Sequence, residues 1–162
     1  MTLSVLPEAG SIAPDFTLPA SQSSGETADL QLSSLRPGKV VVYFYPKDDT
    51  PGCTLEAQDF SRLASEFAAA GTTVIGISKD STARHEKFCR KHDLGLILVS
   101  DAEGTTCEAW GTWGEKQNYG KTYMGITRTT FLLDGKGRIA RVWPKVKVKG
   151  HAEEVLEAAR QL

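Results

Sequence analysis

The sequence predicts an α/β fold with a central mixed sheet and helices on both of its faces. Two observations predict it. Apolar runs rich in β-branched and aromatic residues alternate with segments of helical apolar spacing, and a closing pair of strands precedes a last helix. Strands that alternate with helices favour parallel pairing, whereas a hairpin adds antiparallel strands. Because 162 residues is the length of an ordinary domain, we assign residues 1–162 to a single domain.

The N-terminal half is expected to supply a hairpin, a buried strand and a long helix. Short apolar pieces at 16–18 and 30–32 predict the two strands of the hairpin. The continuous apolar run 40–45 is typical of a strand buried on both faces. Apolar residues at helical spacing then predict a helix over 51–70. Gly71 follows directly, at the position after a helix C-terminus where glycine is favoured.

The rest of the chain continues the alternation and closes with a hairpin and a helix. An Asp-Gly-Lys-Gly turn joins the last two strands. The expected elements are a strand at 72–78, a helix at 82–92, a strand at 94–99, a short helix at 104–110, a loop at 110–125, strands at 126–133 and 138–142, and a helix at 150–161.

Composition excludes several classes of protein. A net charge of −1 gives no reason to expect a nucleic acid or a membrane surface as partner. The N-terminus lacks the features of a signal peptide, and no apolar run is long enough to span a membrane. Three widely spaced cysteines, Cys53, Cys89 and Cys107, favour a reducing, cytoplasmic compartment over a disulfide framework. No glycine-rich phosphate loop follows a strand, so we expect no nucleotide cofactor.

Cys53 follows the buried strand at the start of the predicted helix. Thr50 is a good N-cap residue and Pro51 suits the first helical position, so Cys53 falls in the first turn. Unpaired N–H groups and the helix dipole favour an anion there, in this case a thiolate. A thiolate attacks either an electrophilic sulfur or a peroxide oxygen. The absence of a Cys-x-x-Cys motif argues against dithiol exchange, but these residues alone leave the reaction open.

Residues 46–54, Pro-Lys-Asp-Asp-Thr-Pro-Gly-Cys-Thr, resemble the peroxidatic-cysteine motif of the peroxiredoxins, in particular the PrxQ or bacterioferritin comigratory protein subfamily. The resemblance also includes 13–16, 111–125 and 125–132, and so covers nearly the whole chain. It implies a thioredoxin fold with an N-terminal β-hairpin and a monomeric peroxidase. It also implies reduction of hydrogen peroxide and organic hydroperoxides, recycling by thioredoxin, and no metal or cofactor.

The same resemblance implies a role for four residues. Cys53 would be the peroxidatic cysteine, Pro46 would shield it, Thr50 would hydrogen-bond the peroxide, and Arg128 would polarise thiolate and peroxide together. Arg128 also makes physical sense, because it opens an apolar run where an isolated buried charge would be costly. Its fork of donors can hold a thiolate and a leaving oxygen at once.

The second cysteine of the reaction is less directly indicated. Many PrxQ members carry the resolving cysteine five residues after the peroxidatic one, where this chain has Gln58. Others place it on the following helix, so the resemblance implies a Cys53–Cys89 disulfide. Cys107 or an external thiol are the alternatives. A disulfide needs Cα atoms within about 7 Å, so we expect the first turn around Cys53 to unwind during each cycle.

Other interpretations stay open at this point. The chain could be a thiol–disulfide exchange protein, or a redox sensor or holdase without turnover. His85, Cys89 and His92 share one helical face, which is a weak metal signal, and a solvated face is the favoured interpretation. Glu56, one turn after Cys53, would oppose a thiolate unless it points away or pairs with a cation such as Arg128.

Overall fold

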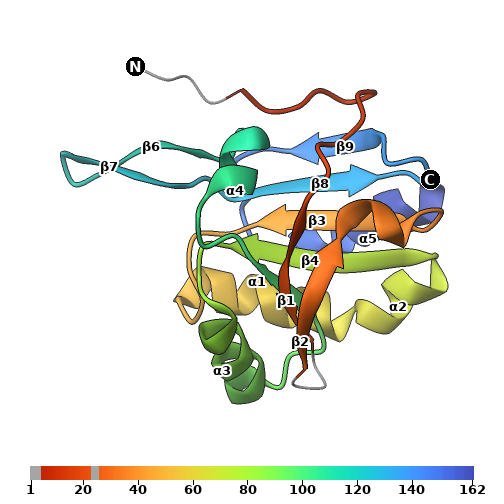
Figure 1. Ribbon diagram of the computed structural model, residues 1–162, viewed down its shortest axis with the longest axis horizontal. Helices are drawn as coiled ribbons and strands as arrows, with labels where there is room; N and C mark the ends of the chain where they lie inside the picture. Colours follow the sequence, from red (N-terminus) through yellow and green to blue (C-terminus); the bar gives the residue numbers. More distant parts are fainter. Residues whose placement is uncertain (1–4, 23–25) are drawn as a thin grey trace.

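A seven-stranded mixed sheet forms the centre of the computed structural model, which describes residues 5–22 and 26–162 (Figure 1). Its order is β2-β1-β5-β4-β3-β8-β9. The strands are β1 Thr17–Ser21, β2 Thr27–Gln31, β3 Lys39–Phe44, β4 Thr72–Ser78, β5 Ile97–Ser100, β8 Thr129–Leu133 and β9 Ile139–Trp143. β3 pairs parallel with β4 and antiparallel with β8, so the predicted mixed sheet is confirmed, as is the N-terminal hairpin β1–β2.

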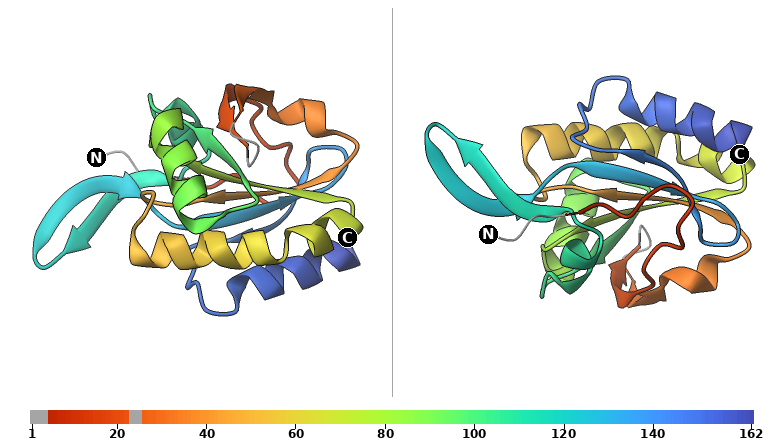
Figure 2. Two further views of the ribbon diagram at one scale, coloured as in Figure 1. Left: turned by 90° about the horizontal axis from the view of Figure 1, so that it is seen from below. Right: turned by 90° about the horizontal axis from the view of Figure 1, so that it is seen from above.

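Helices cover both faces of this sheet, as predicted (Figure 2). They are η1 Leu32–Leu35, α1 Pro51–Arg62, α2 Ala64–Ala69, α3 Thr82–His92, α4 Thr105–Ala109 and α5 His151–Gln161. α1, α2 and α5 lie on one face, η1 and α4 lie on the other, and α3 packs beside β5 and β1. None of the helices in residues 5–22 and 26–162 is long and apolar enough to cross a membrane.

Side chains of β3 alternate between two hydrophobic cores. Val41 and Tyr43 point into the core beneath α1, α2 and α5, while Val42 and Phe44 point into the core of the opposite face. All four are at most 1% exposed. This two-sided burial explains why the strand reads as a continuous apolar run rather than an alternating one. It also fixes the end of β3, from which the chain leads to Cys53.

Two predicted elements have other boundaries in the structure. The helix expected at 51–70 is two helices, which meet at Leu63, where ψ is 3° instead of helical. The bend brings the rings of Phe60 and Phe67 to a centroid separation of 5.9 Å in one core. The bend could not be seen in the sequence, because no glycine or proline lies there. The strand expected at 94–99 begins only at Ile97, because the chain first turns from α3 through a left-handed Asp93.

The segment expected as a loop at 110–125 is mostly a second sheet. β6 Trp113–Asn118 and β7 Lys121–Ile126 pair antiparallel and project from the body as a hairpin (Figure 1). The two residues between them, Tyr119 and Gly120, have φ of 52° and 77°. Two positive φ values in a two-residue connection are the hallmark of a type I′ turn. The sequence hid it because tyrosine, not asparagine or aspartate, holds the first of the two positions.

The strand expected at 126–133 is also interrupted. Ile126 ends β7, and β8 begins at Thr129, so Arg128 lies in the break between them. The backbone is held on both sides, because Thr127 N–H donates to Thr112 O and the Arg128 carbonyl accepts from Val146 N–H. Arg128 therefore lies outside both strands, directly before β8 begins to pair with the end of β3.

Candidate active site

Cys53 lies in the first turn of α1, as predicted, and is 2% exposed. Thr50 is the N-cap residue with extended backbone, and Pro51 follows at the first helical position. The predicted cap by the Thr50 side chain is wrong, however. Its hydroxyl donates to the Lys47 carbonyl at 2.9 Å and makes no hydrogen bond to the first-turn amides. Its oxygen lone pairs therefore remain able to accept a hydrogen bond.

Arg128 is the charged partner of this thiol. Its Nη2 donates to Cys53 Sγ at 3.4 Å, and its Nη1 donates to Glu56 Oε1 at 2.6 Å. Sheet register brings it there, because Phe44 at the end of β3 is paired with Thr129, the residue after Arg128. Gly52 gives the guanidinium room, since a Cβ at that position would lie 3.2 Å from Nη2. The side chain of Arg128 is 17% exposed, so water screens its charge only in part.

Glu56 pairs with Arg128, which resolves the two orientations left open by the sequence. The residue is 1% exposed, and burial raises the pKa of its carboxyl to about 7 although Arg128 pulls in the opposite direction. Its Oε2 has no hydrogen-bond partner among the residues described, and the same holds for the buried hydroxyl of Tyr43. Arg128 is thus shared between the Cys53 thiol and a carboxyl whose own charge varies near neutral pH.

A buried thiol at a helix start that accepts a hydrogen bond from an arginine fits the family that the comparisons identify. The AhpC/TSA family model matches residues 9–142. Peroxiredoxin Bcp of Bacillus subtilis is 45% identical over 155 residues, which are 96% of this chain and 96% of that protein.

The chain belongs to the peroxiredoxin family. Solved structures place it in the PrxQ or bacterioferritin comigratory protein group, as the motif had indicated. The Xanthomonas campestris bacterioferritin comigratory protein, solved in a study of its alkyl peroxide reduction activity, is 43% identical with a TM-score of 0.81. The alignment covers 89% of this chain and 90% of that one. A cysteine-to-serine mutant of Xylella fastidiosa PrxQ has 36% identity and a TM-score of 0.86, with 95% and 96% covered. This peroxiredoxin is therefore a peroxidase with a thioredoxin fold.

The segment between β3 and Cys53 of the peroxiredoxin carries a buried polar network that the sequence did not reveal. Asp48 is 3% exposed and accepts from the Tyr45 hydroxyl at 2.5 Å, while its other oxygen lies 2.6 Å from His85 Nδ1. The second ring nitrogen of His85 donates to Val99 O at 3.0 Å. His85 is fully buried, so the prediction of a solvated histidine face was wrong.

The structure does not bring His85, Cys89 and His92 together as a set of metal ligands; it places His85 beside two aspartates instead. Ligand atoms of Asp48, Asp80 and His85 lie within 4.8 Å of one another. Each of them already has a protein partner, however, and Asp80 Oδ2 accepts from the backbone N–H of Asp48 at 2.8 Å. His92 belongs to a different contact, with Asp49. These contacts favour a hydrogen-bond network over a metal site.

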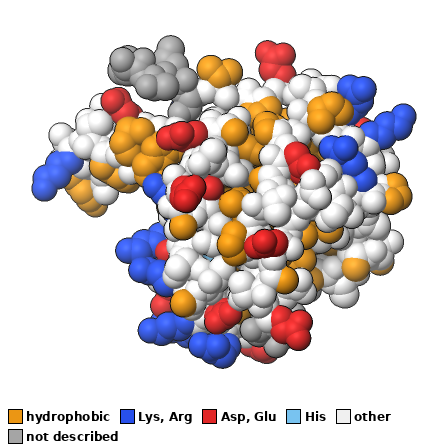
Figure 3. All heavy atoms as spheres, in the orientation of Figure 1, with side chains coloured by type: hydrophobic (Ala, Val, Ile, Leu, Met, Phe, Trp, Pro, Cys, Tyr) orange, Lys and Arg blue, Asp and Glu red, His pale blue; other side chains and the backbone are white. Residues whose placement is uncertain are grey.

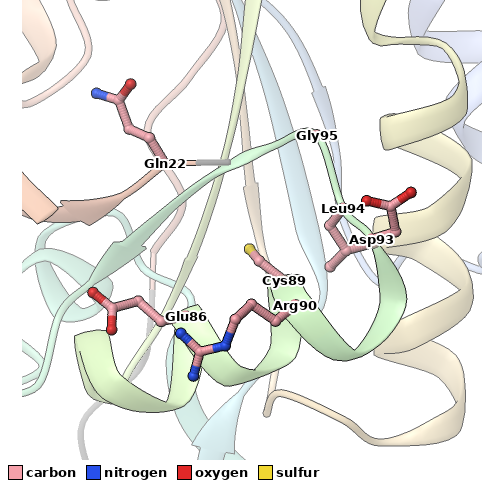
Figure 4. Close-up of a pocket in the computed structure, with 7 residues that line it drawn as sticks. All are labelled: Gln22, Glu86, Cys89, Arg90, Asp93, Leu94 and Gly95. Carbon is pink, nitrogen blue, oxygen red and sulfur yellow. The ribbon is translucent and has the colours of Figure 1, made fainter. Parts of the chain in front are cut away.

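Cys89 lies on α3 and lines a cavity of about 340 Å³. Figure 4 shows its sulfur directed from the helix into this space, with Gln22 and Gly95 on the far side and Glu86 and Arg90 along the helix. Burial, Asp48 and Glu86 raise the pKa of the Cys89 thiol to about 11. Burial, reinforced by these two carboxylates, favours the protonated form, so in the folded protein Cys89 is a thiol.

The three free cysteines lie in two different hydrophobic cores, and this distinguishes Cys89 from Cys107 as a partner for Cys53. Cys53 and Cys89 belong to the same hydrophobic core, on the α1 face. Cys107 belongs to the opposite core, beside Trp110 and across the sheet. Burial and the Asp101 carboxyl raise the pKa of Cys107 far above the usual range of a thiol. Cys107 therefore lies across the sheet from Cys53 and is held as a protonated thiol.

Proposed function

We propose that this peroxiredoxin reduces hydrogen peroxide and organic hydroperoxides through Cys53. The hydrogen bond from Arg128 Nη2 to Cys53 Sγ carries the proposal. A guanidinium that is always charged stabilises the thiolate before attack and the negative charge that develops on the leaving oxygen during it. The alkyl peroxide reduction activity of the X. campestris relative supports organic hydroperoxides as substrates.

In the first step the Cys53 thiolate attacks the terminal peroxide oxygen. An S–O bond forms, the O–O bond breaks, and the leaving alkoxide or hydroxide takes up a proton, which gives an alcohol or water and a Cys53 sulfenic acid. Thr50 would accept a hydrogen bond from the peroxide, since its own hydrogen is directed to Lys47 O. Pro46, directly after the buried Tyr45, would shield the sulfur from water.

In the second step Cys89 condenses with the sulfenic acid to an intramolecular disulfide, which thioredoxin or a similar dithiol then reduces. The shared core of Cys53 and Cys89 supports this pairing. Two X. campestris peroxiredoxin Q structures carry serine in place of one or the other of two cysteines, whose separation in the chain equals that of Cys53 and Cys89. An intramolecular disulfide needs no second subunit, which suits a monomer, and its reduction suits the cytoplasm.

Mass spectrometry of peroxide-treated protein under non-reducing conditions tests the pairing. We expect a Cys53–Cys89 disulfide in the wild type and in Cys107→Ser. We expect a sulfenic or more oxidised Cys53 in Cys89→Ser, and no peroxide consumption by Cys53→Ser. A disulfide that contains Cys107, or peroxide consumption without Cys53, would contradict the assignment.

Turnover separates the proposed enzyme from the other two functions. With thioredoxin, its reductase and NADPH, we expect many molecules of peroxide reduced per molecule of protein. A single turnover would favour a redox sensor. Reduction of insulin disulfides without peroxide consumption would favour a thiol–disulfide exchange protein.

A further inference from the structure

Two consecutive aspartates join the segment before Cys53 to the helix that carries Cys89. Asp48 contacts His85, which lies one helical turn before Cys89 on α3. Both ring nitrogens of His85 lie within hydrogen-bond distance of oxygen atoms, Asp48 Oδ2 on one side and the Val99 carbonyl on the other. Because this contact is buried on all sides, the end of β3 and the start of α3 are held together without competition from water.

Asp49 makes the second part of the connection at the other end of α3. Its carboxylate accepts from Lys91 Nζ at 2.7 Å and from His92 Nε2 at 2.9 Å. Asp49 has a φ of 60°, a left-handed conformation that aspartate and asparagine tolerate better than other residues. The contacts of the two aspartates thus bracket Cys89 along the helix.

Packing on the remaining side of Cys89 is incomplete. The cavity of about 340 Å³ into which its sulfur projects lies between α3, Gln22 and the 93–95 segment (Figure 4). This cavity is partly open to solvent, so water rather than protein atoms lies on this side of α3. On that side little apolar packing resists a movement of the helix, so the polar contacts to Asp48 and Asp49 carry a larger share of its attachment.

We propose that these contacts, Asp48–His85, Asp49–Lys91 and Asp49–His92, form a latch whose opening sets the lifetime of the Cys53 sulfenic acid. The proposal rests on the proposed role of Cys89 as resolving cysteine. While the latch is closed, Cys53 stays in the first turn of α1 under Arg128, and Cys89 stays a protonated thiol on α3. When it opens, α3 and the segment before Cys53 separate, and the two sulfurs can approach to bonding distance.

Two reactions compete for the sulfenic acid. In resolution the Cys89 thiol attacks the Cys53 sulfur, an S–S bond forms, and the hydroxyl leaves as water. In over-oxidation a second peroxide transfers one oxygen to the Cys53 sulfur, which gives sulfinic acid and an alcohol or water. A closed latch delays the first reaction and leaves the second unaffected. The latch therefore sets how much Cys53 is lost at a given peroxide concentration.

Asp49→Asn is the sharpest test, because asparagine keeps the left-handed backbone and loses only the charge. Reduced protein is mixed with one equivalent of hydrogen peroxide, and the sulfenic acid is trapped with dimedone at successive times and quantified by mass spectrometry. We expect its lifetime to shorten about threefold, in line with exposed ion pairs of modest strength. The sulfinic fraction at high peroxide should fall in proportion, and the rate of the first oxidation should stay unchanged.

Lys91→Gln removes the same contact from the side of α3 and should shorten the lifetime in the same direction. Glu66→Gln is the matched control, because it breaks an exposed ion pair with Arg160 that joins α2 to α5 instead. We expect the wild-type lifetime in this control. A salt concentration of about 1 M screens exposed pairs, so it should shorten the wild-type lifetime and leave Asp49→Asn nearly unchanged.

Cys89→Ser distinguishes a failure of the latch from a failure of the proposed function. If Cys89→Ser prolongs the sulfenic acid while Asp49→Asn and Lys91→Gln leave its lifetime unchanged or longer, the latch is refuted and Cys89 remains the resolving cysteine. If Cys89→Ser has the wild-type lifetime, the resolving role itself is refuted, and the latch with it.

Discussion

Replacing Glu56 by glutamine removes the buried carboxyl that shares Arg128 with Cys53 and keeps its shape. The pKa of this carboxyl is about 7 in the folded protein, against 4.5 for an ordinary glutamate. At about 1.4 kcal/mol per pKa unit, this difference corresponds to roughly 3 kcal/mol. The folded state binds a proton that the unfolded state releases between these two values. The contribution of Glu56 to the free energy of unfolding is therefore fully present below pH 4.5 and is lost as the pH rises through 7.

The assay is urea unfolding of the wild type and Glu56→Gln at pH 5 and at pH 8. Glutamine does not titrate. The free energy of unfolding of the wild type should therefore fall by about 2 to 3 kcal/mol more than that of the variant between pH 5 and pH 8. The lost partner of Arg128 adds a constant offset at both pH values and does not enter the comparison. Other titrating groups are common to both proteins and cancel. Equal losses in the two proteins would show that Arg128 keeps Glu56 ionised and would refute the reasoning.

Four further changes test the site and its surroundings. Arg128→Gln should lower the second-order rate constant for peroxide about a hundredfold, the usual effect of removing one preorganised donor, as measured by stopped-flow peroxide consumption. Thr50→Val should slow the same reaction about tenfold, whereas Thr50→Ser, which keeps the hydroxyl, should react like the wild type. Gly52→Ala should lower the rate several-fold without lowering the melting temperature, because its Cβ would lie 3.2 Å from Arg128 Nη2 and displace the guanidinium. Burial lowers the pKa of His151 to about 4 against an ordinary 6.5, so urea unfolding should show a stability that falls from pH 6.5 to pH 4 in the wild type and less so in His151→Gln.

The position of Cys53 could be predicted because its causes are local. A buried strand, Thr50, Pro51 and the helical spacing that follows all lie within a few residues of the thiol, and each acts through its own backbone preference. Arg128 is distant in sequence, and its role came from the family resemblance together with the cost of burying an isolated charge. The structure adds how it arrives there, through the pairing of β8 with β3.

The features that the sequence left hidden depend on contacts between distant segments or on rare backbone conformations. His85 looked like a solvated residue because its partner, Asp48, is 37 positions away. The β6–β7 hairpin looked like a loop because Tyr119 adopts a positive φ, which tyrosine seldom does. In both cases the local pattern was weak, and tertiary structure determined the outcome.

The break between β7 and β8, where Arg128 lies, has a consequence for the protein as it is synthesised. Cys53 leaves the ribosome together with α1, while Arg128, which donates a hydrogen bond to its sulfur, follows 75 residues later. At the usual rate of about 5 to 20 residues per second, several seconds separate the two. Until β8 pairs with β3, the Cys53 sulfur lacks its guanidinium partner. The peroxide chemistry proposed for Cys53 would therefore begin only after most strands of the sheet have been made.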